Sequence, residues 1–139
     1  MTEQIQKLQE RKKVFSYKGK KYLIDSSSRI DGVGDFYENG KLIYVDKDVP
    51  EKFHNGIAVH EIEERIFLKQ GFSYGWSHNQ AQKKELEYYI KEFGEEEAKK
   101  LIHEEDILVN ETVIKICKED LKKLKGQDFV AYNVGHVEN

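Results

Sequence analysis

The segment DVPEKFHNGIAVHEIEERIFLKQG, which runs from Asp48 to Gly71, separates two kinds of sequence pattern. Asp48 and Glu51 have the spacing of a capping box, and Pro50 between them is tolerated in the first turn of a helix. Gly71 suits the left-handed residue that ends many helices. The segment therefore predicts one long helix that ends near Gln70.

The residues before this helix predict a small sheet. Asn39-Gly40 lies between two apolar runs, which is the strongest short signal for a β-hairpin, and Lys18-Gly19-Lys20 separates another such pair. We therefore expect two hairpins that form an antiparallel sheet in the first third of the chain. A polar helix over Glu3 to Lys13 precedes them. The four runs are Val14–Tyr17, Lys21–Ile24, Phe36–Tyr37 and Leu42–Val45.

Helical patterns follow the long helix. Ser77-His78-Asn79-Gln80 forms a second capping box, which opens a helix that ends near Gly94. A third helix is expected from Glu95 to about His103, and another lies within Ile107 to Leu124. Phe129 to Val137 are expected to form either a short strand or an irregular tail.

These elements predict a single α+β domain over residues 1–139. A small antiparallel sheet packs against a metal-binding pair of helices within a core of residues 14–94, and residues 95–139 form a helical C-terminal extension. A chain of 139 residues is long enough to bury one hydrophobic core without disulfides.

Composition limits the classes of function. Charged residues make up 35% of the chain, but the net charge is only −3 and no part is strongly basic, so we expect no nucleic-acid partner. The single Cys117 cannot form an intrachain disulfide, and no apolar run reaches the roughly 18 residues of a membrane span. The polar N-terminal residues lack the pattern of a signal peptide. We expect a cytoplasmic protein that does not bind a membrane. The sequence does not determine its oligomeric state.

The candidate chemistry lies on the long helix. His60 and Glu64 are four residues apart, which places them about 40° apart on one helix face. Phe53, Ile57 and Phe67 lie near the same face, so this face is expected to point inward. A histidine and a carboxylate are costly to bury unless they are paired or bind a metal. Zinc accepts both donor types and commonly has three protein ligands at a catalytic site.

His78 is the best candidate for the third ligand, because the capping box places it in the first turn of the next helix. Glu85, two turns further on, is either an outer partner of a ligand or a rival ligand. Glu61 lies at the edge of the metal face, where a carboxylate can take a proton from metal-bound water. Two histidines and one carboxylate also suit non-haem Fe²⁺, so the metal stays open between zinc and iron.

Other polar residues near this motif have simpler interpretations. His54 lies about 120° from His60 around the helix and is expected to be solvated. Glu61, Glu63 and Arg65 also fit a solvated helix face, and Glu85 also fits a plain surface charge. Tyr74 lies in the loop between the helices, where it could donate to a substrate oxygen, although Phe72, Tyr74 and Trp76 also fit as packing anchors.

The motif His60-Glu61-x-x-Glu64 resembles the His-Glu-x-x-His helix of the zincin metallopeptidases, with glutamate in place of the second histidine. Upstream, residues Gly40 to Asp46 are similar to the edge strand that precedes the metal helix in short gluzincins, including the ImmA/IrrE-type peptidases of mobile elements. Downstream, His78-x-x-Ala81 occupies the place of the Glu-x-x-Ala-like motif that carries the third ligand. The resemblance covers roughly residues 36–93.

This resemblance implies a small zinc metallopeptidase that acts on a peptide or protein substrate. The ligands would be His60, Glu64 and His78. These are the residue types that the family uses, in the order His, Glu, His instead of His, His, Glu. Glu61 would be the general base. The alternative is a non-enzymatic interaction or regulatory protein that keeps a zincin-like metal shell. An iron-dependent oxygenase is a third class, less favoured because such sites usually lie in β-barrels rather than on helices.

Overall fold

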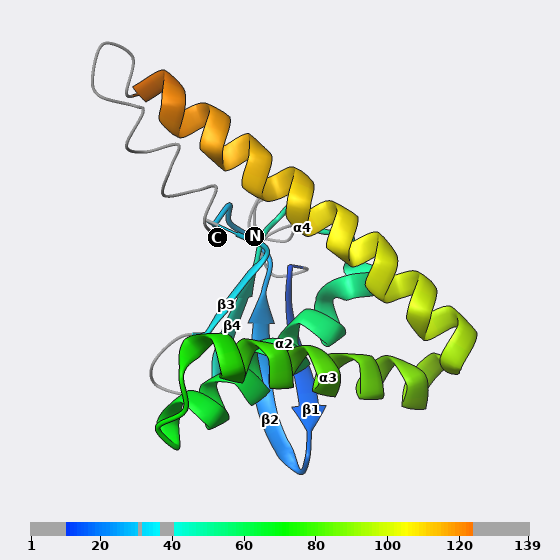
Figure 1. Cartoon of the computed structure of the whole chain (residues 1–139). Coiled ribbons are helices and arrows are strands. Elements are labelled where there is room, and N and C mark those ends of the chain that lie inside the picture. Colours follow the sequence, from blue (N-terminus) through cyan, green and yellow to red (C-terminus); the bar gives the residue numbers. More distant parts are fainter. Residues whose placement is uncertain (1–10, 31, 37–40, 124–139) are drawn as a thin grey trace, which may run out of the picture.

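A four-stranded sheet precedes three helices along the chain (Figure 1). The computed structural model describes residues 11–30, 32–36 and 41–123. The predicted α+β class is confirmed. The elements are the strands β1 (Lys12–Tyr17), β2 (Lys20–Asp25), β3 (Gly34–Phe36) and β4 (Leu42–Val45), the 3₁₀ turn η1 (Glu51–Phe53), and the helices α2 (His54–Lys69), α3 (Tyr74–Phe93) and α4 (Glu95–Lys123).

The sheet is mixed rather than purely antiparallel, with strand order β1-β2-β4-β3. Both predicted strand pairs, β1 with β2 and β3 with β4, are antiparallel. The prediction of an antiparallel sheet was wrong because β2 and β4 join the two pairs in parallel, with Leu23 opposite Leu42. The strand β4 is consequently internal, and the short β3 forms the edge of the sheet. The resemblance had predicted that residues Gly40 to Asp46, which include β4, form an edge strand, and this prediction was wrong.

The first hairpin has the turn that its sequence predicts. Lys18 and Gly19 both have positive φ, 48° and 77°, which matches the twist of the flanking strands. Lys12 and Lys13 belong to β1 and not to the expected N-terminal helix, whose other residues up to 10 lie outside the described part of the chain. The predicted Asn39-Gly40 turn also lies outside the described residues.

The long helix begins differently from the prediction. Pro50 is the N-cap residue of η1, and no side chain caps it, so the expected capping box of Asp48 and Glu51 does not form. The Asp48 amide instead donates to Asp46 Oδ2 at 3.1 Å, which shapes the turn after β4. The end of the helix agrees with the prediction, because Gly71 has a φ of 95° directly after α2.

A single helix, α4, occupies the region where two were expected. The sequence from Glu95 to Lys123 contains neither glycine nor proline, so no residue breaks the helix near His103. The segment Phe129 to Val137, expected as a short strand or an irregular tail, lies outside the described residues. None of the described helices has the length and apolarity needed to cross a membrane.

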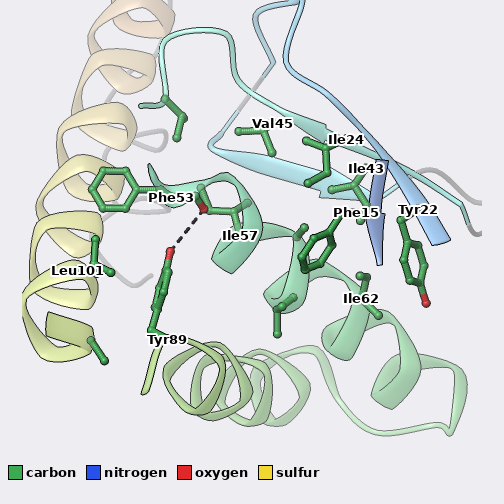
Figure 2. Packing of buried hydrophobic residues seen from close by; sticks show 14 residues of the cluster. Phe15, Tyr22, Ile24, Ile43, Val45, Phe53, Ile57, Ile62, Tyr89 and Leu101 are labelled. Carbon is green, nitrogen blue, oxygen red and sulfur yellow. Dashed lines mark hydrogen bonds between the residues drawn. The ribbon is translucent and has the colours of Figure 1, made fainter. Parts of the chain in front are cut away.

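The core lies where α2 packs between the sheet and α3 (Figure 2). One face of the sheet is buried, whereas Val14 on the opposite face is 66% exposed. Tyr89 of α3 is fully buried, and α4 closes this end of the core with Ala98 and Leu101. The sheet contributes Phe15, Tyr22, Ile24, Ile43 and Val45, and η1 with α2 contributes Phe53, Ile57, Ala58, Val59 and Ile62.

Candidate metal centre

The helix α2 presents His60 and Glu64 on one face, one turn apart, as their spacing predicts. Their side chains are each 12% exposed, and Ile57 one turn earlier is buried in the core. His60 Nε2 lies 3.0 Å from Glu64 Oε2. The inward orientation of this face is therefore confirmed.

His78 reaches this pair from α3, although the helix starts earlier than predicted. Ser73 is the N-cap residue, and its hydroxyl accepts a hydrogen bond from the Trp76 amide at 3.3 Å. The predicted cap Ser77 lies inside the helix and is fully buried. His78 thus occupies the second turn of α3 rather than the first, and its Nδ1 lies 3.0 Å from Glu64 Oε2.

Three donor atoms form a compact triangle. His60 Nε2 and His78 Nδ1 are 3.2 Å apart, and each lies 3.0 Å from Glu64 Oε2. In a tetrahedral zinc site with bonds of about 2.0–2.1 Å, two ligand atoms are separated by about 3.4 Å. The observed separations are close to this value, and the two imidazoles with one carboxylate match the donor preference of zinc. His60, Glu64 and His78 could therefore hold a metal ion.

Glu85 fixes the orientation of the His60 ring. Its Oε1 lies 3.2 Å from His60 Nδ1, on the side of the ring opposite Glu64. A carboxylate can only accept, so Nδ1 carries a proton and donates it to Glu85, and Nε2 is the nitrogen that can bind a metal ion once its own proton leaves. This is the usual arrangement of a carboxylate behind a metal-binding histidine. The geometry makes Glu85 an outer partner of His60 rather than a member of the triangle.

The charges of the triangle are strongly coupled. Burial lowers the pKa of His60, but the hydrogen bonds to Glu64 and Glu85 outweigh it and raise that pKa to about 10. Burial raises the pKa of Glu64, but hydrogen bonds from His60 and His78 reverse the effect and lower it. A metal ion would compete with a proton for these donor atoms, so binding should release protons.

Glu61 lies beside the triangle and outside it. Burial raises the pKa of Glu61 to about 7, the nearby His60 opposes this rise, and the Glu64 carboxylate adds to it. Its side chain passes close to the edge strand, since a methyl group added at Gly34 would lie 3.2 Å from Glu61 Oε1. A carboxylate with a pKa near neutrality can both accept and return a proton.

Tyr74 opens α3 at the rim of the site. Tyr74 is 65% exposed, and its ring stacks on His78, with ring centres 5.8 Å apart and planes inclined by 21°. Burial and the nearby carboxylates of Glu64 and Glu61 raise its pKa, so the hydroxyl keeps its proton at neutral pH. The neighbouring Phe72 and Trp76 stack on each other at 4.2 Å, as expected of packing anchors.

A cavity of about 710 Å³ lies next to these residues, which is large enough for part of a peptide. His60, Glu61, Glu64, Tyr74, His78 and Glu85 all line it. The helix α4 supplies a wall that the sequence analysis missed. The residues of that wall are Ile102, Glu105, Asp106 and Val109.

Two residues expected to be solvated are buried. His54 is 5% exposed, and its Nε2 lies 2.9 Å from the Val49 carbonyl oxygen; burial lowers its pKa, which suits a neutral ring that donates to this carbonyl. Glu63 is buried beneath the first hairpin and pairs with Lys18 Nζ at 3.3 Å. Neither residue reaches the metal triangle.

Comparisons with protein-family models, with curated proteins and with solved structures found no match to this chain. The zincin resemblance of the motif around His60 therefore stays a hypothesis. What the geometry itself supports is a group of two histidines and one glutamate that could hold a metal ion at the wall of a cavity.

Proposed function

We propose that this protein is a zinc-dependent hydrolase that cleaves peptide bonds. The observation that carries the proposal is the triangle of His60 Nε2, Glu64 Oε2 and His78 Nδ1, with separations of 3.0–3.2 Å. Three protein ligands on zinc leave a fourth position for water or substrate. The wide cavity beside the triangle supports access of a substrate to that position.

Zinc, when bound, supplies a Lewis acid that polarises a carbonyl group and lowers the pKa of a bound water molecule. His60, Glu64 and His78 would hold it. Glu85 keeps the proton of His60 on Nδ1, so that Nε2 stays available as a donor atom. These residues bind and orient, and they do not themselves exchange protons with a substrate.

Glu61 is the proposed general base. It lines the cavity but does not belong to the metal-binding group, so its carboxylate is free to take a proton from water. Its pKa of about 7 matches this task, because a base works best when its pKa lies near the working pH. The same group can then give the proton to the leaving amine.

Tyr74 is the proposed donor to the substrate carbonyl. Its hydroxyl is protonated at neutral pH, and its exposed ring lies at the cavity wall beside His78. A donor placed near the developing oxyanion lowers the barrier to hydrolysis. The stack on His78 would hold the Tyr74 ring in place.

The test is a cleavage assay on a peptide library with purified wild type, the Glu61→Gln variant and chelator-treated protein. The proposal expects cleavage by wild type that the other two lack and that added zinc restores to the chelator-treated sample. The same cleavage pattern in all three samples would assign the activity to a contaminant. A wild type that binds zinc without cleaving any peptide would favour the non-enzymatic interaction protein.

A further inference from the structure

Two buried carboxyl groups lie behind the metal triangle. Glu85 of α3 is 3% exposed and Glu105 of α4 is 6% exposed, and both line the same cavity. Glu85 Oε1 contacts His60, but Glu85 Oε2 is buried and has no hydrogen-bond partner within the described part of the chain. A buried carboxylate oxygen without a partner is costly, so a proton donor should lie near it.

We infer that Glu105 is a neutral carboxylic acid that donates its proton to Glu85 and thereby positions His60 for metal binding. The inference rests on the proposed metal centre and adds α4 to it. Glu105 is a positioning residue here, because it acts on the metal ligand only through Glu85. It would give Glu85 Oε2 the donor that it otherwise lacks.

The contacts of Tyr89 show which oxygen of Glu105 is available for this bond. The Tyr89 hydroxyl lies 3.4 Å from Glu105 Oε1 and 3.4 Å from the Phe53 carbonyl oxygen, and both of these atoms can accept its proton. Figure 2 shows the hydroxyl directed toward Phe53. With Oε1 on the Tyr89 side, Oε2 of Glu105 is the oxygen left to carry a proton toward Glu85.

Electrostatics favours the same arrangement. Two ionised carboxylates that share a buried site repel each other, and holding one proton between them removes the repulsion. Burial raises the pKa of Glu105 to about 11, and the negative charge of Glu85 contributes to the rise. A proton donated by Glu105 to Glu85 Oε2 leaves Glu85 Oε1 available to accept from His60 Nδ1.

The first test measures zinc affinity by competition with a chromophoric chelator for wild type, Glu105→Gln and Glu105→Leu. A glutamine amide can still donate to Glu85 and accept from Tyr89, so Glu105→Gln should bind zinc within about 3-fold of wild type. Leucine removes the donor, and loss of an outer partner typically weakens metal binding about 10- to 100-fold. Thermal unfolding of each variant, measured without metal, separates this loss from a general loss of fold.

Asp106→Asn is the matched control, because Asp106 is exposed, neighbours Glu105 on α4 and lines the same cavity. Its zinc affinity should stay close to that of wild type. Equal losses in Glu105→Gln and Glu105→Leu would show that the negative charge of Glu105 matters, which would overturn the inference. Wild-type affinity in Glu105→Leu would overturn it as well.

A second measurement separates failure of this inference from failure of the metal centre. Infrared spectra of the metal-free protein at neutral pH should contain a C=O stretching band of a protonated carboxyl group that is absent from Glu105→Gln and still present in Asp106→Asn. Identical spectra of wild type and Glu105→Gln would show that Glu105 is ionised and would overturn the inference. A wild type that fails to bind zinc would instead overturn the proposed metal centre.

Discussion

Glu64 is the side chain on which the proposed metal centre depends. Its Oε2 lies 3.0 Å from one nitrogen of each histidine, so a single oxygen meets two imidazole rings. His60 directs its Nδ1 proton to Glu85, and because its pKa is raised to about 10, a second proton lies on Nε2 and faces the Glu64 oxygen. A metal ion can take the place of this proton between the nitrogen and the oxygen. The triangle is thus suited to bind a cation.

The Glu61→Gln substitution separates proton transfer from metal binding. Glutamine keeps the shape of the side chain but cannot accept a proton, so zinc content and thermal stability should match wild type. Turnover should fall about 10²- to 10⁴-fold, the usual effect of removing a general base. Peptide cleavage rates and zinc content measured on the same preparations test this. Loss of zinc from Glu61→Gln would instead identify Glu61 as a ligand.

Single residues also show where helix periodicity misleads. His54 and Glu63 lie away from the apolar face of α2, so the sequence predicts them to be solvated. Both are buried because their partners come from outside the helix: the Val49 carbonyl for His54 and Lys18 of the first hairpin for Glu63. Periodicity within one helix contains no information on partners that other elements supply.

At the level of elements, the contact between α2 and α3 sets the position of the candidate ligands. Gly56 allows this contact, because a methyl group added at Gly56 would overlap the Tyr89 hydroxyl. Tyr89 is fully buried and its hydroxyl reaches the Phe53 carbonyl, so the ring has little room to move. Close approach of the two helices thus depends on the absence of a side chain at residue 56.

Substitution of this glycine should destabilise the fold. Gly56→Ala introduces an overlap in a packed core, and such overpacking costs about 1–3 kcal/mol. Gly75→Ala is the matched control, since no atom lies within 4 Å of an added methyl group in the first turn of α3. Alanine should stabilise that position by up to about 1 kcal/mol. Urea denaturation of both variants checks the opposite signs, and equal stabilities would contradict the described packing.

The helix α3 illustrates why the meeting of His78 with Glu64 could be predicted although the predicted helix start was wrong. The predicted cap Ser77 and the observed cap Ser73 are four residues apart, close to one turn of 3.6 residues. The earlier start adds about one turn before Ser77 and leaves His78 near the N-terminal end of α3. His78 therefore still lies close to the end of α2 and meets Glu64.

For the whole molecule, α4 closes both the core and the cavity. Ala98 and Leu101 complete the hydrophobic cluster, and Glu105 and Val109 line the cavity wall beside the metal triangle. Lys52 and Glu104 form an ion pair that adds a contact between η1 and α4. The helix is thus a part of the domain that carries the site and more than an appended extension.

The packing of α4 can be tested with a pair of substitutions on the helix. Leu101→Ala removes a buried side chain and should cost about 2–5 kcal/mol in the free energy of unfolding. Ile107 lies on the same helix but is 46% exposed, so Ile107→Ala should change stability by about 0.5 kcal/mol or less. Chemical denaturation measures both values. Similar effects of the two substitutions would contradict the docking of α4.

Local signals predicted most of the elements but not how they assemble. The α+β class, both strand pairs and the ends of α2 and α3 at Gly71 and Gly94 follow from turn and cap residues. The parallel pairing of β2 with β4 joins strands that are distant in the sequence, so no local pattern predicts it. The contribution of α4 had one available signal: Glu105 continues the stripe formed by Ala98, Leu101 and Ile102 at helical spacing.

The metal content of the purified protein tests the central claim most directly. Elemental analysis should use protein purified without chelators or a metal-affinity step. The variants are His60→Ala, Glu64→Ala and His78→Ala, with His103→Ala as the control because His103 is exposed on α4. We predict about one zinc per chain in wild type and in the control, and strongly reduced zinc in the three ligand variants. Unchanged metal content in all three ligand variants would contradict the metal centre.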